Sequence, residues 1–169
     1  MSSNESLNTL LLLRHAQAVD GLPGHPDSER PLTELGQRQA HGVGEFLRSS
    51  DISVDLIICS PAVRTRQTCE ALGLAAPIQI EPTIYNAGSD TIAERVREVA
   101  PENATVLVVG HAPGIPALAY DLADPNTSDT GARALLDRGY PPATLVRLTS
   151  NQAWAEMTTW QLVQTRWAD

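Results

Sequence analysis

Three short segments of the chain carry residue types that could bind and transfer an anionic group. Arg14 and His15 directly follow an apolar run of four leucines, Arg64 ends the segment SPAVR, and His111 follows the apolar run VLVVG. Arginine presents a planar fork of donors that matches phosphate or carboxylate, and histidine can act as a nucleophile or exchange protons near neutral pH. If the three segments converge, they predict an anion site that is best suited to phosphate.

Each of these segments lies at the end of a run whose pattern predicts a buried strand. Four leucines are too few to span a membrane, which needs about 20 apolar residues, but they suit a strand that is covered on both faces of a sheet. Further apolar runs between turn residues bring the expected number of strands to six. We expect these strands at Thr9–Leu13, Leu56–Cys59, Ile78–Glu81, Thr105–Val109, Thr144–Leu148 and Met157–Val163.

Helical patterns lie between most of these strands. The first helix is expected to begin after Thr33, which has the side chain of an N-cap, and to reach about Leu47. Its apolar spacing predicts an inner face made of Leu35, Val43, Phe46 and Leu47.

A second helix is expected to start at Ser60 and Pro61, which suit an N-cap and a first helical position, and to stop at Gly73. Three more helices are expected over Thr91–Val99, after Pro113 and after Gly131.

Strands that alternate with helices predict right-handed crossovers and a mostly parallel sheet. We therefore expect a single α/β domain over residues 1–169, built as a three-layer sandwich with the sheet flanked by helices. Ligands of such sheets gather at the carboxyl ends of the strands, where the two histidines and two arginines would meet.

Composition excludes several classes of function. The formal net charge is −8, all twelve basic residues are arginine, and no basic run is present, so nucleic acid and anionic membranes are not expected partners. The lack of lysine excludes Schiff-base chemistry and a P-loop. The segment MSSNES has no positive charge of the kind a signal peptide carries, and Cys59 and Cys69 do not suggest a disulfide framework. We expect a cytoplasmic protein with reduced thiols.

The segments LLLLRHAQA, SPAVRTRQT and VVGHAPG, in this order, resemble the histidine phosphatase superfamily, which has the phosphoglycerate-mutase-like fold. The hallmarks of that family are Arg-His-Gly, Ser-Pro-x-x-Arg-x-x-x-Thr and Gly-His. Ala16 replaces the hallmark glycine, as in the short SixA-like phosphohistidine phosphatase branch, and ERPLTELGQRQA from Glu29 is similar to the segment that follows in that branch. The resemblance implies a phosphatase that uses no cofactor and no metal.

The resemblance also implies roles for individual residues. His15 would attack phosphorus and carry the phosphoryl group transiently, while Arg14, Arg64 and His111 would clamp that group. Arg30 matches a position of the branch pattern and is a further candidate for contact with substrate.

Four other side chains in or near the motifs have expected roles outside the reaction. We expect His25 to be solvated and His41 to be exposed or satisfied on its helix, and Arg66 and Gln67 to be surface or supporting residues.

Two rival chemistries do not fit the spacing. Cysteine-dependent phosphatases place five residues between cysteine and arginine, whereas four separate Cys59 from Arg64 and six separate it from Arg66. Cys59 is therefore expected to be a buried strand residue. A metal hydrolase needs three or more convergent ligands, and the four histidines form neither an HxH nor an HExxH pattern.

One part of the family pattern is missing. Many members supply a glutamate as general acid, but the segment Ile84–Ala87 holds no acid, and Ala112 stands where an aspartate sometimes follows the second histidine. Asp20, Glu81 and Asp90 are the remaining alternatives. The lack of an acid implies an open, shallow site.

The favoured substrate is a phosphohistidine on a protein. Hydrolysis of a small phosphorylated metabolite, or phosphate and phosphoprotein binding without catalysis, stays open as an alternative. The roles of the loops Asp20–Thr33 and Asp124–Gly131 stay open as well.

Overall fold

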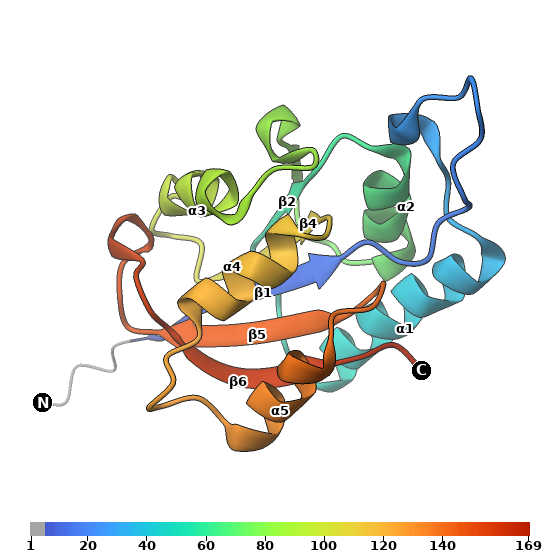
Figure 1. Ribbon diagram of the computed structural model, residues 1–169. Coiled ribbons are helices and arrows are strands. Elements are labelled where there is room, and N and C mark those ends of the chain that lie inside the picture. Colours follow the sequence, from blue (N-terminus) through green and yellow to red (C-terminus); the bar gives the residue numbers. More distant parts are fainter. Residues whose placement is uncertain (1–5) are drawn as a thin grey trace, which may run out of the picture.

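The computed structural model describes residues 6–169, which form a six-stranded sheet between two layers of helices (Figure 1). The strand order is β3-β2-β4-β1-β5-β6; β3, β2, β4 and β1 run parallel, while β5 and β6 are antiparallel to their neighbours. The mostly parallel α/β sandwich is thus confirmed. The strands are β1 (Asn8–Arg14), β2 (Leu56–Cys59), β3 (Ile78–Ile80), β4 (Thr105–Gly110), β5 (Leu145–Ser150) and β6 (Gln161–Arg166).

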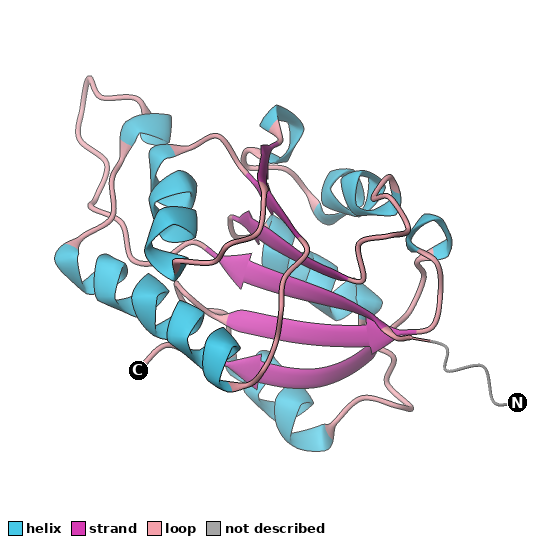
Figure 2. Ribbon diagram, turned by 180° about the vertical axis from the view of Figure 1, so that it is seen from behind, coloured by secondary structure: helices cyan, strands magenta, loops and turns pink. Residues whose placement is uncertain are grey.

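The helices divide between the two faces of the sheet, as Figure 2 shows from behind. One face carries α1 (Glu34–Ser49) and α2 (Val63–Leu72), and the other carries α3 (Ser89–Arg97), α4 (Gly114–Leu122) and α5 (Thr130–Arg138). Short 3-10 turns are η1 (Asp27–Glu29), η2 (Pro82–Ile84) and η3 (Trp154–Glu156). No helix of the described residues has the length and apolarity needed to cross a membrane.

The leucines of β1 explain why this strand is so apolar. Leu10 and Leu12 pack in the core on the side of α3, α4 and α5, whereas Leu11 and Leu13 pack under α1 and α2. All four are fully buried, and each such burial is worth about 1.5–3 kcal/mol relative to exposure. β1 is therefore fixed from both faces, and the residues that follow it start from a rigid position.

The first helix forms where the sequence predicts it, but its inner face is narrower than expected. Thr33 is the N-cap and accepts a hydrogen bond from the Gly36 amide, yet Leu35 is 38% exposed and Phe46 only half-buried. The buried positions are largely small because α1 lies close to α2. A side chain at Gly44 would collide with the backbone of Leu72. Apolar spacing alone does not reveal this contact.

The last strand lies further along the chain than expected, at Gln161–Arg166 instead of Met157–Val163. Met157 and Trp160 are buried outside any regular strand. The Met157 carbonyl accepts hydrogen bonds from Arg97, and Trp160 forms only an isolated bridge with Ala123. The expected strand began too early because these two buried loop residues are apolar, as buried strand residues are. The first five residues, which include most of the segment MSSNES, lie outside the described residues.

Candidate active site

Strand register places the two motif histidines side by side. β1 and β4 are parallel neighbours, and Arg14 pairs with Gly110 at their carboxyl ends. The His15 amide donates to the Gly110 carbonyl at 2.9 Å, so the residue after each strand lies at the same level. The imidazole rings of His15 and His111 are neighbours, with centroids 5.5 Å apart and planes inclined by 59°. The sheet edge therefore unites the first and third motifs, as the sequence predicts.

Helix α2 brings Arg64 to the same edge. The hydroxyl of Thr68 accepts a hydrogen bond from the Ala16 amide at 3.1 Å and donates to the Arg64 carbonyl at 2.7 Å. This hydroxyl ties the turn after His15 to the first turn of α2. The Arg64 side chain is only 3% exposed because the η1 turn lies over it, and its Nη2 is 3.1 Å from Nδ1 of His111.

Ser60 has a different role from the N-cap that its sequence suggests. Its hydroxyl lies 2.7 Å from Nε2 of His111 and makes no cap, and α2 begins later, at Val63, with Ala62 as the N-cap residue. The carbonyl of Ser60 accepts from the hydroxyl of Thr65 at 2.7 Å. Ser60 thus orients His111 instead of capping the N-terminus of the helix.

Hydrogen bonding defines the proton positions on both imidazoles. Because Arg64 Nη2 can only donate, Nδ1 of His111 accepts, and its Nε2–H donates to the Ser60 hydroxyl. Nδ1 of His15 lies 2.7 Å from the Ala16 carbonyl, which can only accept, so this nitrogen carries the proton. Nε2 of His15 is left with a free lone pair, which is the form a nucleophile requires.

The surroundings keep both histidines neutral at pH 7. Burial, opposed by the bond to the Ala16 carbonyl and aided by the charges of Arg64 and Arg14, lowers the pKa of His15 to about 4. Burial and the charge of Arg64 lower the pKa of His111 to about 3. A neutral His15 keeps its lone pair over the whole physiological range.

Asp27 is a site residue that the sequence did not reveal. Its Oδ2 accepts from Arg64 Nη2 at 3.0 Å and from the Tyr85 hydroxyl at 2.5 Å, and its Oδ1 accepts from Arg30 Nε at 2.9 Å. These bonds, that of Tyr85 first, hold the pKa of the Asp27 carboxyl far below its usual range. The only available signal was its place within DSERPLT, beside the flagged Arg30.

The three acids considered from sequence lie elsewhere. Asp20 is exposed on the loop after β1, Glu81 accepts hydrogen bonds from Thr83, and Asp90 lies in the first turn of α3. Within residues 6–169, none of them has a hydrogen bond or ion pair to either histidine or to Arg64.

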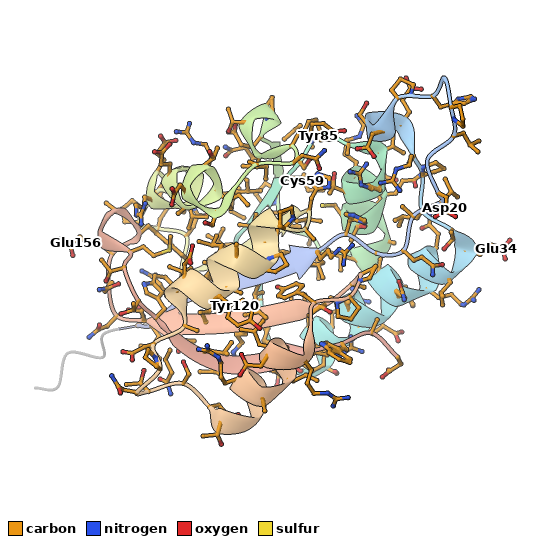
Figure 3. The ribbon with its side chains drawn as sticks, viewed as in Figure 1. Asp20, Glu34, Cys59, Tyr85, Tyr120 and Glu156 are labelled. Carbon is orange, nitrogen blue, oxygen red and sulfur yellow. The ribbon has the colours of Figure 1, made fainter. Side chains whose placement is uncertain are left out.

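Tyr85 is the second residue that the sequence passed over. Its ring and that of His111 are T-shaped to each other with centroids 5.4 Å apart, and Figure 3 labels its position. The chain around Tyr85 is packed closely against α4, since a side chain at Gly114 would collide with the Ala87 carbonyl. Where many members of the family carry an acid, this segment therefore supplies an aromatic ring and a hydroxyl.

Two buried arginine nitrogens provide donors for an anion. Nε of Arg14 and Nε of Arg64 are buried, and neither has a hydrogen-bond partner among the described residues. Nη1 of Arg14 is oriented by the Tyr140 carbonyl at 2.8 Å. Buried donors without partners are costly, and a bound oxyanion would satisfy them.

Arg30 reaches the rim of this cluster. It bonds Asp27 and the Val19 carbonyl, and its side chain is 25% exposed. Its contact with substrate stays a prediction.

The remaining flagged residues have supporting or surface roles, as expected. His25 and Arg66 are exposed, and His41 is paired with Glu45 on the surface of α1. Gln67 accepts a hydrogen bond from the Leu32 amide and so holds the end of the long loop. Cys59 is a buried strand residue.

No group of three or more histidine, cysteine, aspartate or glutamate side chains in residues 6–169 is arranged to hold a metal ion.

The fold and this edge of the sheet define a phosphatase of the histidine-dependent class. Residues 10–87 match the sequence profile of the histidine phosphatase superfamily (branch 1), and together with the relatives given next this match shows that the chain belongs to the superfamily. A solved structure from Nakamurella multipartitia with the provisional name phosphohistidine phosphatase SixA is 36% identical, covers 96% of both chains and superposes with a TM-score of 0.85.

Two further relatives extend over most of the chain. An uncharacterised protein of Mycobacterium tuberculosis is 33% identical over 86% of this chain and 91% of its own length. Phosphohistidine phosphatase SixA of Escherichia coli is 26% identical over 70% of this chain and 76% of its own length. The family, the fold and the phosphatase class expected from the three motifs are thus confirmed.

Proposed function

We propose that this phosphatase removes phosphate from phosphohistidine on a protein, with His15 as the nucleophile. The observation that carries the proposal is the combination of a neutral His15, whose Nε2 lone pair is free, with buried arginine donors and, among residues 6–169, no proton-donating carboxyl group beside them. The similarity to SixA proteins supports the same substrate class.

The first step transfers the phosphoryl group to the enzyme. Nε2 of His15 attacks phosphorus as the P–N bond of the substrate breaks, and the substrate imidazole leaves as a neutral ring after protonation by solvent. The charge of the equatorial oxygens is met by Arg14 and Arg64, whose unpartnered Nε groups are already in place. His111 is neutral and donates through Nε2 to Ser60, so in this state it positions Arg64 through Nδ1.

The second step returns the enzyme to its resting state. Water attacks phosphorus on His15, the P–N bond to Nε2 breaks, and inorganic phosphate leaves. The proton of the water passes to solvent or to the phosphate. Because Nδ1 of His15 stays bonded to the Ala16 carbonyl, the ring keeps its orientation through both steps.

The ionised carboxylate of Asp27 is the reason why we expect the enzyme to cleave a P–N bond in preference to an alkyl P–O bond. An alkoxide leaving group needs a proton as it departs, and a carboxylate held ionised cannot supply one. Tyr85 is equally unsuited, because its bond to Asp27 raises its pKa above the ordinary value. Imidazole, with a conjugate-acid pKa of about 6.5, leaves without such help.

The test is kcat/KM at one pH across substrates whose leaving groups differ in basicity. We expect a histidine-phosphorylated protein and phosphoramidate to react fastest, aryl phosphates more slowly, and sugar or glycerol phosphates most slowly. A flat series, or sugar phosphates at the top, would contradict the proposal and indicate a metabolite phosphatase with a proton donor. Binding without turnover of any compound would indicate a phosphate-binding domain.

A further inference from the structure

Arg64 has a free Nε–H for an anion, but the neighbouring Nη2 is already bonded to other side chains. Nε–H and Nη2–H point in the same direction and form the side-on fork that binds two oxygens of a phosphoryl group. Nε has no partner within the described chain, whereas Nη2 uses both of its hydrogens: one is donated to Oδ2 of Asp27 at 3.0 Å and the other to Nδ1 of His111 at 3.1 Å. The backbone carbonyl of Asp27 takes Nη1 as well, at 2.9 Å.

We propose that Asp27 is a built-in competitor of the phosphoryl group for Arg64, and that it determines how tightly the site holds phosphate. A phosphoryl oxygen takes Nη2 by displacing the exposed Asp27 carboxylate, and not the buried His111 that Ser60 holds in place, while Nε binds a second oxygen. The inference rests on the proposed function only in taking Arg64 as part of the phosphoryl site.

The geometry around Asp27 provides a place for the displaced carboxylate. Oδ1 is bonded to Nε of Arg30, three residues further along the same turn, and this ion pair does not involve Arg64. The Asp27 side chain is 47% exposed, so it can turn toward solvent while it keeps Arg30 as its partner. The exchange therefore leaves no buried charge unpaired.

Charge balance gives the reason for such a competitor. Arg14, Arg30 and Arg64 contribute three positive charges, both histidines are neutral at pH 7, and Asp27 contributes one negative charge. The cluster thus carries a net charge of +2, which matches a phosphoryl dianion without exceeding it. Without Asp27 the surplus charge would retain inorganic phosphate, the product of the reaction. Asp27 thus favours product release.

The test is the dissociation constant of inorganic phosphate at pH 7.5, measured by calorimetry on the full chain. Asp27→Asn keeps the shape of the side chain and removes its charge, so we expect phosphate to bind at least ~10-fold more tightly, and to inhibit turnover more strongly by a similar factor. Glu29→Gln is the matched control: it removes the same charge from the same 3-10 turn, and Glu29 forms no ion pair among the described residues. It should change the constant less than ~2-fold.

A purely structural role for Asp27 makes the opposite prediction. Asp27→Ala removes the acceptor for Arg64, Arg30 and Tyr85 together. If Asp27 only held the turn in place, both variants would bind phosphate more weakly, and Ala more so than Asn. Competition predicts tighter binding in both. Unchanged or weaker binding in Asp27→Asn would overturn the inference.

A different set of results would contradict the proposed phosphoryl site itself. Arg64→Ala should abolish phosphate binding. Binding that persists in Arg64→Ala would contradict the role of Arg64 in the site, whatever the Asp27 variants do. Absence of binding in the wild type and in Asp27→Asn alike would contradict both proposals.

Discussion

Lowering the pH from 7 to 5 should destabilise the fold through its two buried site histidines. The folded pKa of His15 is about 4 and that of His111 about 3, both below the value of about 6.5 expected in the unfolded chain. Between pH 6.5 and 4 the unfolded state therefore binds more protons, and the free energy of unfolding falls as the pH falls. At pH 5 the loss is about 2 kcal/mol for each histidine relative to pH 7.

Asp27 does not obscure this window. Asp27 has the opposite linkage: its depressed pKa stabilises the fold above its ordinary value of 3.8, and this contribution is lost only below that pH. Urea denaturation at pH 7 and pH 5 measures the change. His15→Asn should reduce the pH-dependent loss by about 2 kcal/mol, whereas His41→Gln, at an exposed histidine of α1, should leave it unchanged. The same loss in His15→Asn as in the wild type would refute the argument that His15 is held neutral.

Further predictions concern catalysis and packing. Arg64→Ala should lower kcat/KM by at least ~100-fold, with the fold retained in circular dichroism, and Arg64→Lys should not restore activity because a point charge cannot replace the two-pronged contact. Full activity in Arg64→Ala would show that Arg64 does not bind the phosphoryl group. Gly44→Ala should destabilise the protein by at least about 1 kcal/mol because its methyl group would meet the Leu72 backbone, although alanine favours helices. Gly42→Ala, in open space on the same helix, should instead stabilise the protein by about 0.5–1 kcal/mol, and thermal unfolding of the pair checks both signs.

The convergence of the motifs could be predicted because it depends on strands. His15 and His111 each follow a run of buried aliphatic residues, and parallel neighbours bring the ends of such runs to one edge. The position of Arg64 could be predicted for a related reason. Helix α2 starts after β2, so its first turn, which contains Arg64, lies at the same edge of the sheet. These features are local in sequence, and the sheet makes them close in space.

Asp27 and Tyr85 could not be predicted because no periodic element positions them. Asp27 lies in a loop whose ends are fixed by the bridge between Ala18 and Leu32, and whose course depends on the bond from Arg30 to the Val19 carbonyl. Such contacts have no signature in composition or spacing. Tyr85 likewise depends on the 3-10 turn before it and on the close approach to α4.

Ser60 and the last strand show a second reason why the sequence alone does not predict every feature. Serine before proline suits a helix cap, but a tertiary hydrogen bond to His111 competes for the same hydroxyl and prevails. Met157 and Trp160 are as buried as strand residues, although they lie in a loop. In both places a long-range contact overrides the local pattern.

The most direct test of the account is the identity of the phosphorylated residue during turnover. Rapid acid-free denaturation of the enzyme after mixing with labelled phosphohistidine protein, followed by peptide analysis at alkaline pH, should locate the label on Nε2 of His15 through an acid-labile bond. His15→Asn should retain the fold and form no labelled enzyme. Label on Cys59 or Ser60, or full activity in His15→Asn, would contradict the central claim that His15 carries the phosphoryl group.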